Sequence, residues 1–351
     1  MRKRIKPVLP LGWVVLMAVG IVLSSSPVHA EQGDVKAQSD LLAICFVDEQ
    51  NGWAVGTRGG VFHSADQGIH WEQQTIDTIQ DLLSVSFCDT SVGWVVGQEG
   101  LIFHTQDGGK HWERQKTPKK KQLLDNFAIS AEKCWAVGDW GVILYTDDGG
   151  RTWQDRSYPE DIIFNKVVFS DENIGWIAGE MGTVLRTTDG GATWTPVEAA
   201  QETLFSISFT DDQVGVAVGL GGVIIRTQDG GLTWTRTDGG SDSAGEPNVA
   251  QGDEDAAKAV YSVSVSGDQA IAAGDAGTVL YSQDQGRTWN KVEMPPIARL
   301  LWLRGTCFKN NRAYIVGARS TIFMIENGQL AAWGNLDRVA KVDNAMAMKK
   351  K

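Results

Sequence analysis

Six aspartates recur along the chain inside one short motif, Ser/Thr-x-Asp-x-Gly-x-Thr-Trp, in which only the last threonine varies to histidine. Carboxylates are the groups with which glycoside hydrolases work, but such an enzyme needs two of them converging on one bond, about 5 to 9.5 Å apart. One motif per repeat spreads the carboxylates apart instead. We therefore interpret the aspartates and the tryptophans that close each motif as structural: Asp66, Asp107, Asp148, Asp189, Asp229 and Asp284, with Trp71, Trp112, Trp153, Trp194, Trp234 and Trp289.

The motif is the second half of a longer unit, which is clearest between Gly175 and Trp194. Two short apolar runs are separated there by a Gly-containing tetrapeptide, which predicts a hairpin, and the Asp-Gly-Gly turn reverses the chain again. The unit recurs seven times at a spacing of roughly 41 residues, and such a period marks solenoids, propellers or arrays. In the seventh copy only Glu326-Asn327-Gly328 and Trp333 remain. The glycines that end the first run are Gly56, Gly97, Gly138, Gly179, Gly219, Gly274 and Gly317.

Each copy also begins with an apolar run, such as 204–209, and ends with another after its tryptophan, which makes four strands, A to D. Four-stranded units that contact only their neighbours close into a β-propeller, which protects the sheet edges by radial repetition. A linear β-solenoid is the alternative, but its coils are usually shorter. We predict an all-β fold, a seven-bladed β-propeller with four-stranded blades over residues 41–336, in which residues 31–40 either precede the ring or lie along blade seven.

The two ends and one insertion fall outside this repeat. Residues 1–30 combine basic residues, an apolar run and Val-His-Ala, which predicts a cleaved signal peptide and an exported, periplasmic protein, soluble or peripheral to a membrane. An uncleaved anchor is the alternative, although the apolar run is shorter than the ~20 residues of a membrane span. Residues 31–40 form an N-terminal extension and 337–351 a C-terminal tail. The insertion at 237–259 is acidic and poor in hydrophobic residues, as loosely held loops are.

Charge and cysteines limit the possible partners. The formal net charge is −11, which argues against nucleic acid as a partner because its phosphates attract net positive charge. Cys45 and Cys307 fall at the same strand position in copies one and seven, which ring closure makes neighbours. A closing disulfide and two separate thiols both remain open. No Cys-x-x-Cys or His cluster suggests a metal, and no helix follows the Gly-rich pieces as a dinucleotide loop requires, so we expect no cofactor.

The loops that vary between copies indicate where a partner binds. The B–C turns and the D-to-A links emerge on one face of a propeller, while the A–B turns and the Asp motifs emerge on the other. The second face repeats nearly unchanged, whereas the first varies, and binding residues concentrate on variable loops of a rigid scaffold. Ordinary loop drift is the alternative. The candidate partner-binding residues are Arg58, Glu99, Asp139, Trp140, Glu180, Met181, Asp275 and Arg319, together with Lys119, Lys120 and Lys121.

The whole repeat, G-W-x-x-G-x-x-G-x-[IVL]-x-x-T-x-D-G-G-x-T-W, resembles that of the photosystem II stability/assembly factor family of plastids and cyanobacteria. The residues that carry the resemblance are 52–56, 93–97, 134–138 and 175–179, each followed by its Asp motif, which itself looks like the Asp box of sialidases. The family implies a seven-bladed propeller on the lumenal or periplasmic side of a membrane, which binds membrane-protein assembly intermediates without catalysis. Related chains also occur in bacteria that do not photosynthesise, as accessories of envelope complexes such as transporters, and we expect this chain to be one of them.

These observations predict an exported, monomeric, non-enzymatic propeller that serves as an assembly, stability or accessory factor for a membrane protein complex. The rival functions are a sialidase-like or other Asp-box glycoside hydrolase and a propeller that binds a glycan or small ligand in its central funnel. Sialidases use three arginines, a tyrosine nucleophile and an Arg-Ile-Pro-type motif near the mature N-terminus. The predicted mature chain has no such motif.

Overall fold

Each of the seven repeats folds into its own antiparallel sheet, which confirms the predicted β-propeller. The computed structural model describes residues 39–237 and 258–336, and it describes 338–341 as backbone. The predicted signal peptide and most of the acidic insertion lie outside the described residues. In the part of the chain that is described, no helix is long and apolar enough to cross a membrane.

The strands follow one another in chain order within every sheet. Blade one holds β1 (Leu41–Phe46), β2 (Gly52–Gly56), β3 (Val61–Ser64) and β4 (Glu72–Gln73); blade two β5 (Leu82–Phe87), β6 (Gly93–Gly97), β7 (Ile102–Thr105) and β8 (Glu113–Arg114); blade three β9 (Leu123–Ala128), β10 (Cys134–Gly138), β11 (Ile143–Thr146) and β12 (Gln154–Asp155). Blade four holds β13 (Phe164–Phe169), β14 (Gly175–Gly179), β15 (Thr183–Thr187) and β16 (Thr195–Glu198); blade five β17 (Leu204–Phe209), β18 (Gly215–Gly219), β19 (Ile224–Thr227) and β20 (Thr235–Arg236). Blade six holds β21 (Val260–Ser266), β22 (Gln269–Gly274), β23 (Val279–Ser282) and β24 (Asn290–Lys291); blade seven β25 (Leu303–Lys309), β26 (Arg312–Gly317), β27 (Thr321–Glu326), β28 (Gln329–Asn335) and β29 (Arg338–Lys341).

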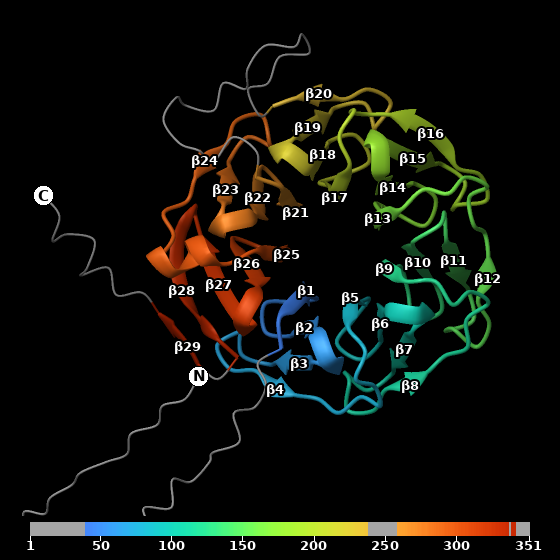
Figure 1. Cartoon of the computed structure of the whole chain (residues 1–351), viewed down its shortest axis with the longest axis horizontal. Coiled ribbons are helices and arrows are strands. Elements are labelled where there is room, and N and C mark those ends of the chain that lie inside the picture. Colours follow the sequence, from blue (N-terminus) through green and yellow to red (C-terminus); the bar gives the residue numbers. More distant parts are fainter. Residues whose placement is uncertain (1–38, 238–257, 337, 342–351) are drawn as a thin grey trace, which may run out of the picture. The chain divides into compact units, whose positions relative to one another are not determined.

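The first strand of each blade faces the centre of the ring, and each of these strands packs against the next one around it (Figure 1). The last of them, β25, packs against the first, β1, so the described residues form a closed ring. Within the described residues, no sheet combines strands from the two ends of the chain. The ring therefore closes by side-chain packing and hydrogen bonds, without exchange of a strand.

Of the predicted N-terminal extension, only residues 39 and 40 are described, and both contact blade seven. The N–H of Arg319 donates to Oδ1 of Asp40 at 2.7 Å, and the Ser320 hydroxyl donates to the carbonyl of Ser39 at 2.7 Å. These contacts hold the start of blade one against the end of the ring.

Blade seven departs from the predicted four strands. The boundary at residue 336 is too early, because β29 (Arg338–Lys341) pairs with β28 as a fifth strand. Where the other blades carry an Asp motif, blade seven has a hairpin whose turn is Asn327-Gly328, with φ of 50° and 75°. Asn-Gly is the preferred sequence for such a two-residue turn, because both positions need positive φ.

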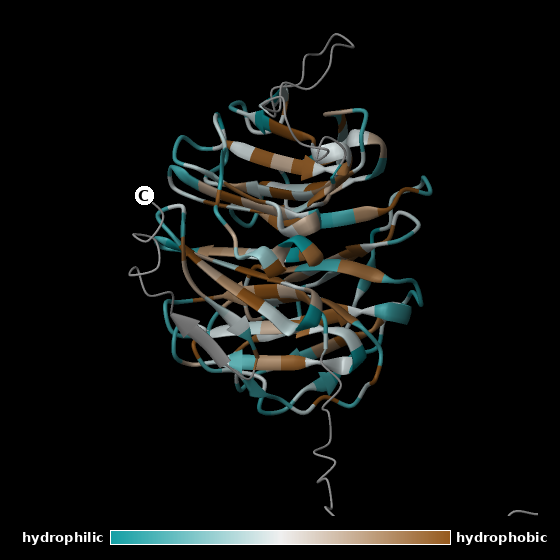
Figure 2. Ribbon diagram, turned by 60° about the vertical axis from the view of Figure 1, so that its left-hand side comes forward, coloured by the Kyte–Doolittle hydropathy of each residue, from teal (hydrophilic) through white to brown (hydrophobic). Residues whose placement is uncertain are grey.

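The largest buried side chains are the tryptophans of the second strand, rather than those of the Asp motifs. Trp53, Trp94, Trp135 and Trp176 are fully buried. Of the Asp-motif tryptophans, Trp71 and Trp153 are buried and the other four are only partly buried. The second strand of a blade is covered by a neighbouring blade on each side, which explains the difference. Figure 2 shows the hydrophobic residues concentrated along the strands.

Neighbouring inner strands are joined by side chains that accept backbone N–H groups across the gap between blades. Phe46 donates to Sγ of Cys307 at 3.2 Å, and Ala128 donates to Oγ of Ser86 at 2.9 Å. Cys307 thus points toward blade one, while Cys45 packs in the cluster between blades one and two. Because the two thiols point the same way around the ring, they do not meet, and both are free.

Candidate functional site

The six Asp motifs have one hydrogen-bond pattern, seen clearly at Asp189. Its Oδ1 accepts the N–H of Thr193 at 2.9 Å and the hydroxyl of Thr187 at 2.8 Å, and its Oδ2 accepts the Thr193 hydroxyl at 2.6 Å. Hydrogen bonds from the side chain and backbone of Thr193 lower the pKa of Asp189 to about 2. The other five aspartates accept equivalent bonds from the residues two before and four after. Each carboxylate is thus engaged within its own turn.

The connections separate onto two faces. The B–C turns bond to the D-to-A links, as where the N–H of Gly141 donates to the carbonyl of Ile162 at 2.7 Å. The Asp motifs bond to the A–B turns, as where Gly190 donates to Asn173 at 2.9 Å. We call the first surface the tip face and the second the Asp-box face. This is the separation that the alternation of strand directions predicts.

The tip of each B–C turn requires a left-handed backbone. The middle residue has a φ between 49° and 68° in every blade. Glycine fits this conformation without steric cost, yet only blade five has one, Gly221. The side chains held there at a cost of about 1 kcal/mol or more each belong to Arg58, Glu99, Trp140, Met181, Ala276 and Arg319.

Exposed apolar side chains gather on the tip face. Of the large hydrophobic residues that are exposed in the described part of the chain, only Leu232 lies on the Asp-box face. A face that exposes many large apolar side chains is a candidate interaction surface. The others lie in the tips, in the D-to-A links or beside them on blade seven: Ile79, Trp140, Met181, Leu220, Ile297, Leu300 and Trp333.

The structure brings some of the predicted partner-binding residues together and keeps others apart. Nζ of Lys121 lies 4.1 Å from the ring centroid of Trp140, and partial burial together with the negative charge of Glu180 raises the pKa of Asp139. Lys119 instead pairs with Asp155 at 2.9 Å. Lys120 lies in the same link, and the remaining candidates sit on the tips of separate blades: Arg58, Glu99, Met181, Asp275 and Arg319.

Sequence reasoning missed a second set of tip-face residues. Every first strand has an irregular register at its second residue, and such bulges re-aim a side chain. At these positions Phe205 and Tyr261 have ring centroids 5.5 Å apart, and the Arg304 guanidinium lies 4.4 Å from the Tyr261 ring. The signal was present in the sequence, because this position differs between copies while the one before it stays apolar.

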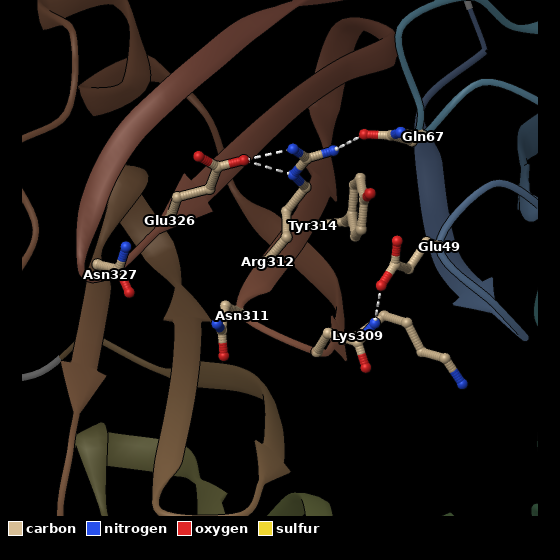
Figure 3. Close-up of a pocket in the computed structure, with 9 residues that line it drawn as sticks. Glu49, Gln67, Lys309, Asn311, Arg312, Tyr314, Glu326 and Asn327 are labelled. Atoms are coloured by element: carbon tan, nitrogen blue, oxygen red, sulfur yellow. Dashed lines mark hydrogen bonds and ion pairs between the residues drawn. The ribbon is translucent and has the colours of Figure 1, made fainter.

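A polar cavity of about 370 Å³ lies where blades seven and one meet, on the Asp-box face (Figure 3). Its centre is the Arg312 guanidinium, which pairs with Glu326 and donates to Oε1 of Gln67 at 2.8 Å. Asn310 donates to Glu49 at 2.6 Å across the same seam. Beside the cavity, blade seven has the two-residue turn Asn327-Gly328 where the other blades have the longer Asp motif. The polar bonds of the cavity run between the two blades and join them.

In the described residues, no group of three His, Cys, Asp or Glu side chains is placed to hold a metal ion. The four cysteines lie apart as free thiols. Burial raises the pKa of Cys88 to about 11 and that of Cys307 to about 12. The geometry thus offers a rigid scaffold with one variable, partly apolar face.

Comparison with known proteins agrees with this architecture. The family model described as photosynthesis system II assembly factor YCF48 matches residues 24–123, 111–201 and 196–328. No match is found among curated proteins.

Solved structures share the fold at low sequence identity. YCF48 bound to D1 peptide is 22% identical, with a TM-score of 0.65, over 82% of this chain and 93% of that one. YCF48 from Cyanidioschyzon merolae is 22% identical, with a TM-score of 0.63, over 81% and 94%. The GH74 xyloglucanase from Xanthomonas campestris is 14% identical, with a TM-score of 0.67, over 86% of this chain but only 55% of that one.

Proposed function

The chain belongs to the photosynthesis system II assembly factor YCF48 family, and from this we propose that it is an exported, non-enzymatic factor that binds a membrane protein complex, or an assembly intermediate of one, through its tip face. The observation that carries the proposal is the gathering of exposed apolar side chains on that face, two of which, Trp140 and Met181, stand on left-handed backbone. Left-handed backbone strain at an exposed non-glycine residue lowers stability, and such strain is expected where the side chain serves binding.

Two further observations support the proposal. One solved member of the same fold is described as bound to a D1 peptide, which favours a protein segment as the ligand. The Asp-motif carboxylates each accept hydrogen bonds within their own turns, which leaves them poorly placed as the acid and base of a glycosidase. The partner in a non-photosynthetic bacterium would be an envelope complex such as a transporter.

The test is capture of the partner from crosslinked membranes with the full-length chain, followed by mass spectrometry. We expect one membrane complex to be recovered reproducibly with the wild type and lost when Trp140, Met181 and Leu220 are changed together to serine. Recovery that is unaffected by this triple change, but lost when Leu232 on the opposite face is changed to serine, would contradict the proposal.

A further inference from the structure

Two adjacent tips share a composition that the other five lack. In blades three and four a carboxylate is followed by a large apolar residue, as Asp139-Trp140 and Glu180-Met181. The Trp140 and Met181 side chains are 58% and 64% exposed. Their backbones have φ of 62° and 53°, so packing within the chain does not account for these residue types.

The link between these two blades adds negative charge between the tips. It carries Glu160 and Asp161, both exposed, and it is fixed at both sides. The Ile162 carbonyl accepts the N–H of Gly141 at 2.7 Å, and the N–H of Ile163 donates to Glu180 at 3.1 Å. Asp161 therefore lies between an apolar tip on one side and an apolar tip on the other.

The link that carries Asp161 is bonded to both tips, and the carboxylate of Glu180 accepts the N–H of Ile163 in that link at 3.1 Å. Partial burial raises the pKa of Asp139 above its usual value, and the negative charges of Glu180 and Asp161 raise it further, while the positive charge of Lys121 lowers it. Within the described ranges, no lysine or arginine forms an ion pair with Asp139, Asp161 or Glu180. Nζ of Lys121 lies 4.1 Å from the centroid of the Trp140 ring.

We propose that this acidic arc, formed by Asp139, Trp140, Asp161, Glu180 and Met181, docks a cationic and apolar segment of the partner protein. The inference rests on the proposed function, because it names the chemistry of the segment that the tip face would bind. An arginine or lysine of the segment would be held between the carboxylates, while its apolar neighbours cover Trp140 and Met181. Complementary charge steers and orders such an encounter, and buried aromatic anchors supply most of the affinity.

The chemistry of the arc disfavours other ligands. A nucleic acid or an anionic lipid headgroup would meet three carboxylates. A purely apolar segment would leave those carboxylates desolvated without a partner, which costs free energy. A segment with alternating leucine and arginine satisfies both parts of the surface.

The experiment uses the full-length chain and three fluorescein-labelled twelve-residue peptides. The first alternates Leu and Arg, the second replaces Arg with Glu, and the third replaces Leu with Ser. Binding is followed by fluorescence anisotropy at low and moderate salt. We expect only the Leu-Arg peptide to bind tightly, and we expect Asp139→Asn, Asp161→Asn and Glu180→Gln together to weaken it at least tenfold.

The matched control removes the same number of exposed carboxylates elsewhere on the tip face, with Asp77→Asn, Glu198→Gln and Glu293→Gln together. The control variant should bind the Leu-Arg peptide less than twofold more weakly than the wild type. Because both variants lose the same number of negative charges, a larger loss in the arc variant reports the arc itself and not the general attraction of a cationic peptide to an acidic protein. Equal losses in the two variants, or no loss in the first, would overturn the inference.

Capture from crosslinked membranes separates this inference from the proposed function when the variant without the arc carboxylates is compared with the variant in which Trp140, Met181 and Leu220 are serine. Capture that depends on Trp140, Met181 and Leu220 but not on the arc carboxylates refutes the cationic segment and leaves the proposed function standing. Capture that depends on neither refutes both.

Discussion

Asp125 and Lys166 form an ion pair at 2.9 Å between the inner strands of blades three and four. Asp125 is almost fully buried, and it also accepts the hydroxyl of Ser84 in blade two at 2.8 Å and the N–H of Val167 at 3.0 Å. A single carboxylate thus ties three consecutive blades together beside the central channel.

Replacing Asp125 with alanine should therefore destabilise the propeller more than an ordinary surface change. It removes three hydrogen bonds and leaves the Val167 N–H and the Ser84 hydroxyl without their acceptor, which costs about 2–4 kcal/mol in the free energy of unfolding. Lys166 is one-third exposed and can hydrate, which limits the loss. Urea unfolding would measure the change, and Asp147→Ala at an exposed position of the same blade should change it by less than about 0.5 kcal/mol.

Trp176 should matter more to stability than the tryptophan of its own Asp motif. It is fully buried, stacks on Phe209 with ring centroids 3.5 Å apart, and donates to the Gly230 carbonyl at 2.8 Å. Trp176→Ala should cost about 3–5 kcal/mol because it leaves a large cavity. Trp194 is partly exposed and its Nε1 has no partner among the described residues, so Trp194→Ala should cost less. Equal losses in thermal unfolding would contradict this ranking.

The repeat and its turn residues were sufficient to predict the seven blades, because every copy repeats the same hairpin and turn signals. The departures of blade seven from the repeat, and the burial of individual tryptophans, required the structure. The Asn327-Gly328 turn is visible in the sequence, but the fifth strand at 338–341 and the polar cavity around Arg312 are not. The burial of each tryptophan depends on contacts with the neighbouring blade, and the sequence pattern of one blade does not show these contacts.

The sequence predicts which loops share a face of the propeller, but it does not predict which of their side chains are exposed and unpaired. Alternating strand directions placed the tips and links together, and the structure has them so. The sequence did not show that Lys119 is paired with Asp155, nor that Ile79 and Leu300 project from the links into solvent. Bulged residues such as Tyr261 and Arg304 were missed because a bulge arises from strand pairing, which a single copy does not reveal.

His104 should make stability depend on pH. Its ring stacks on Trp94 with centroids 4.4 Å apart, and burial lowers its pKa below the usual value of about 6.5. As the pH falls below about 6.5, the unfolded chain binds a proton that the folded chain does not, so the free energy of unfolding decreases until the folded pKa is passed.

The change His104→Tyr should flatten this dependence, because Tyr145 occupies the equivalent position in blade three and packs against Trp135 with ring centroids 4.5 Å apart. The measurement is urea unfolding between pH 5 and 8. His111→Thr is the control, since His111 is exposed and threonine is the residue found there in other motifs. If the slope of the free energy of unfolding against pH is unchanged by His104→Tyr, or abolished by His111→Thr, then His104 is not the group responsible for the pH dependence.

Trp140→Gly separates stability from binding more sharply than any other change on the tip face. Glycine relieves the left-handed strain at φ 62°, which favours the variant by about 1 kcal/mol. The greater entropy of the unfolded chain and the lost contact with Lys121 offset part of that gain. The melting temperature should therefore stay the same or rise slightly, while partner capture from crosslinked membranes falls at least tenfold because an aromatic anchor is lost. Leu232→Gly removes an exposed apolar side chain from the Asp-box face and should leave capture intact. If Trp140→Gly lowers both the melting temperature and the capture of the partner, the Trp140 side chain has a packing role within the chain, and the result contradicts its assignment as an anchor for the partner.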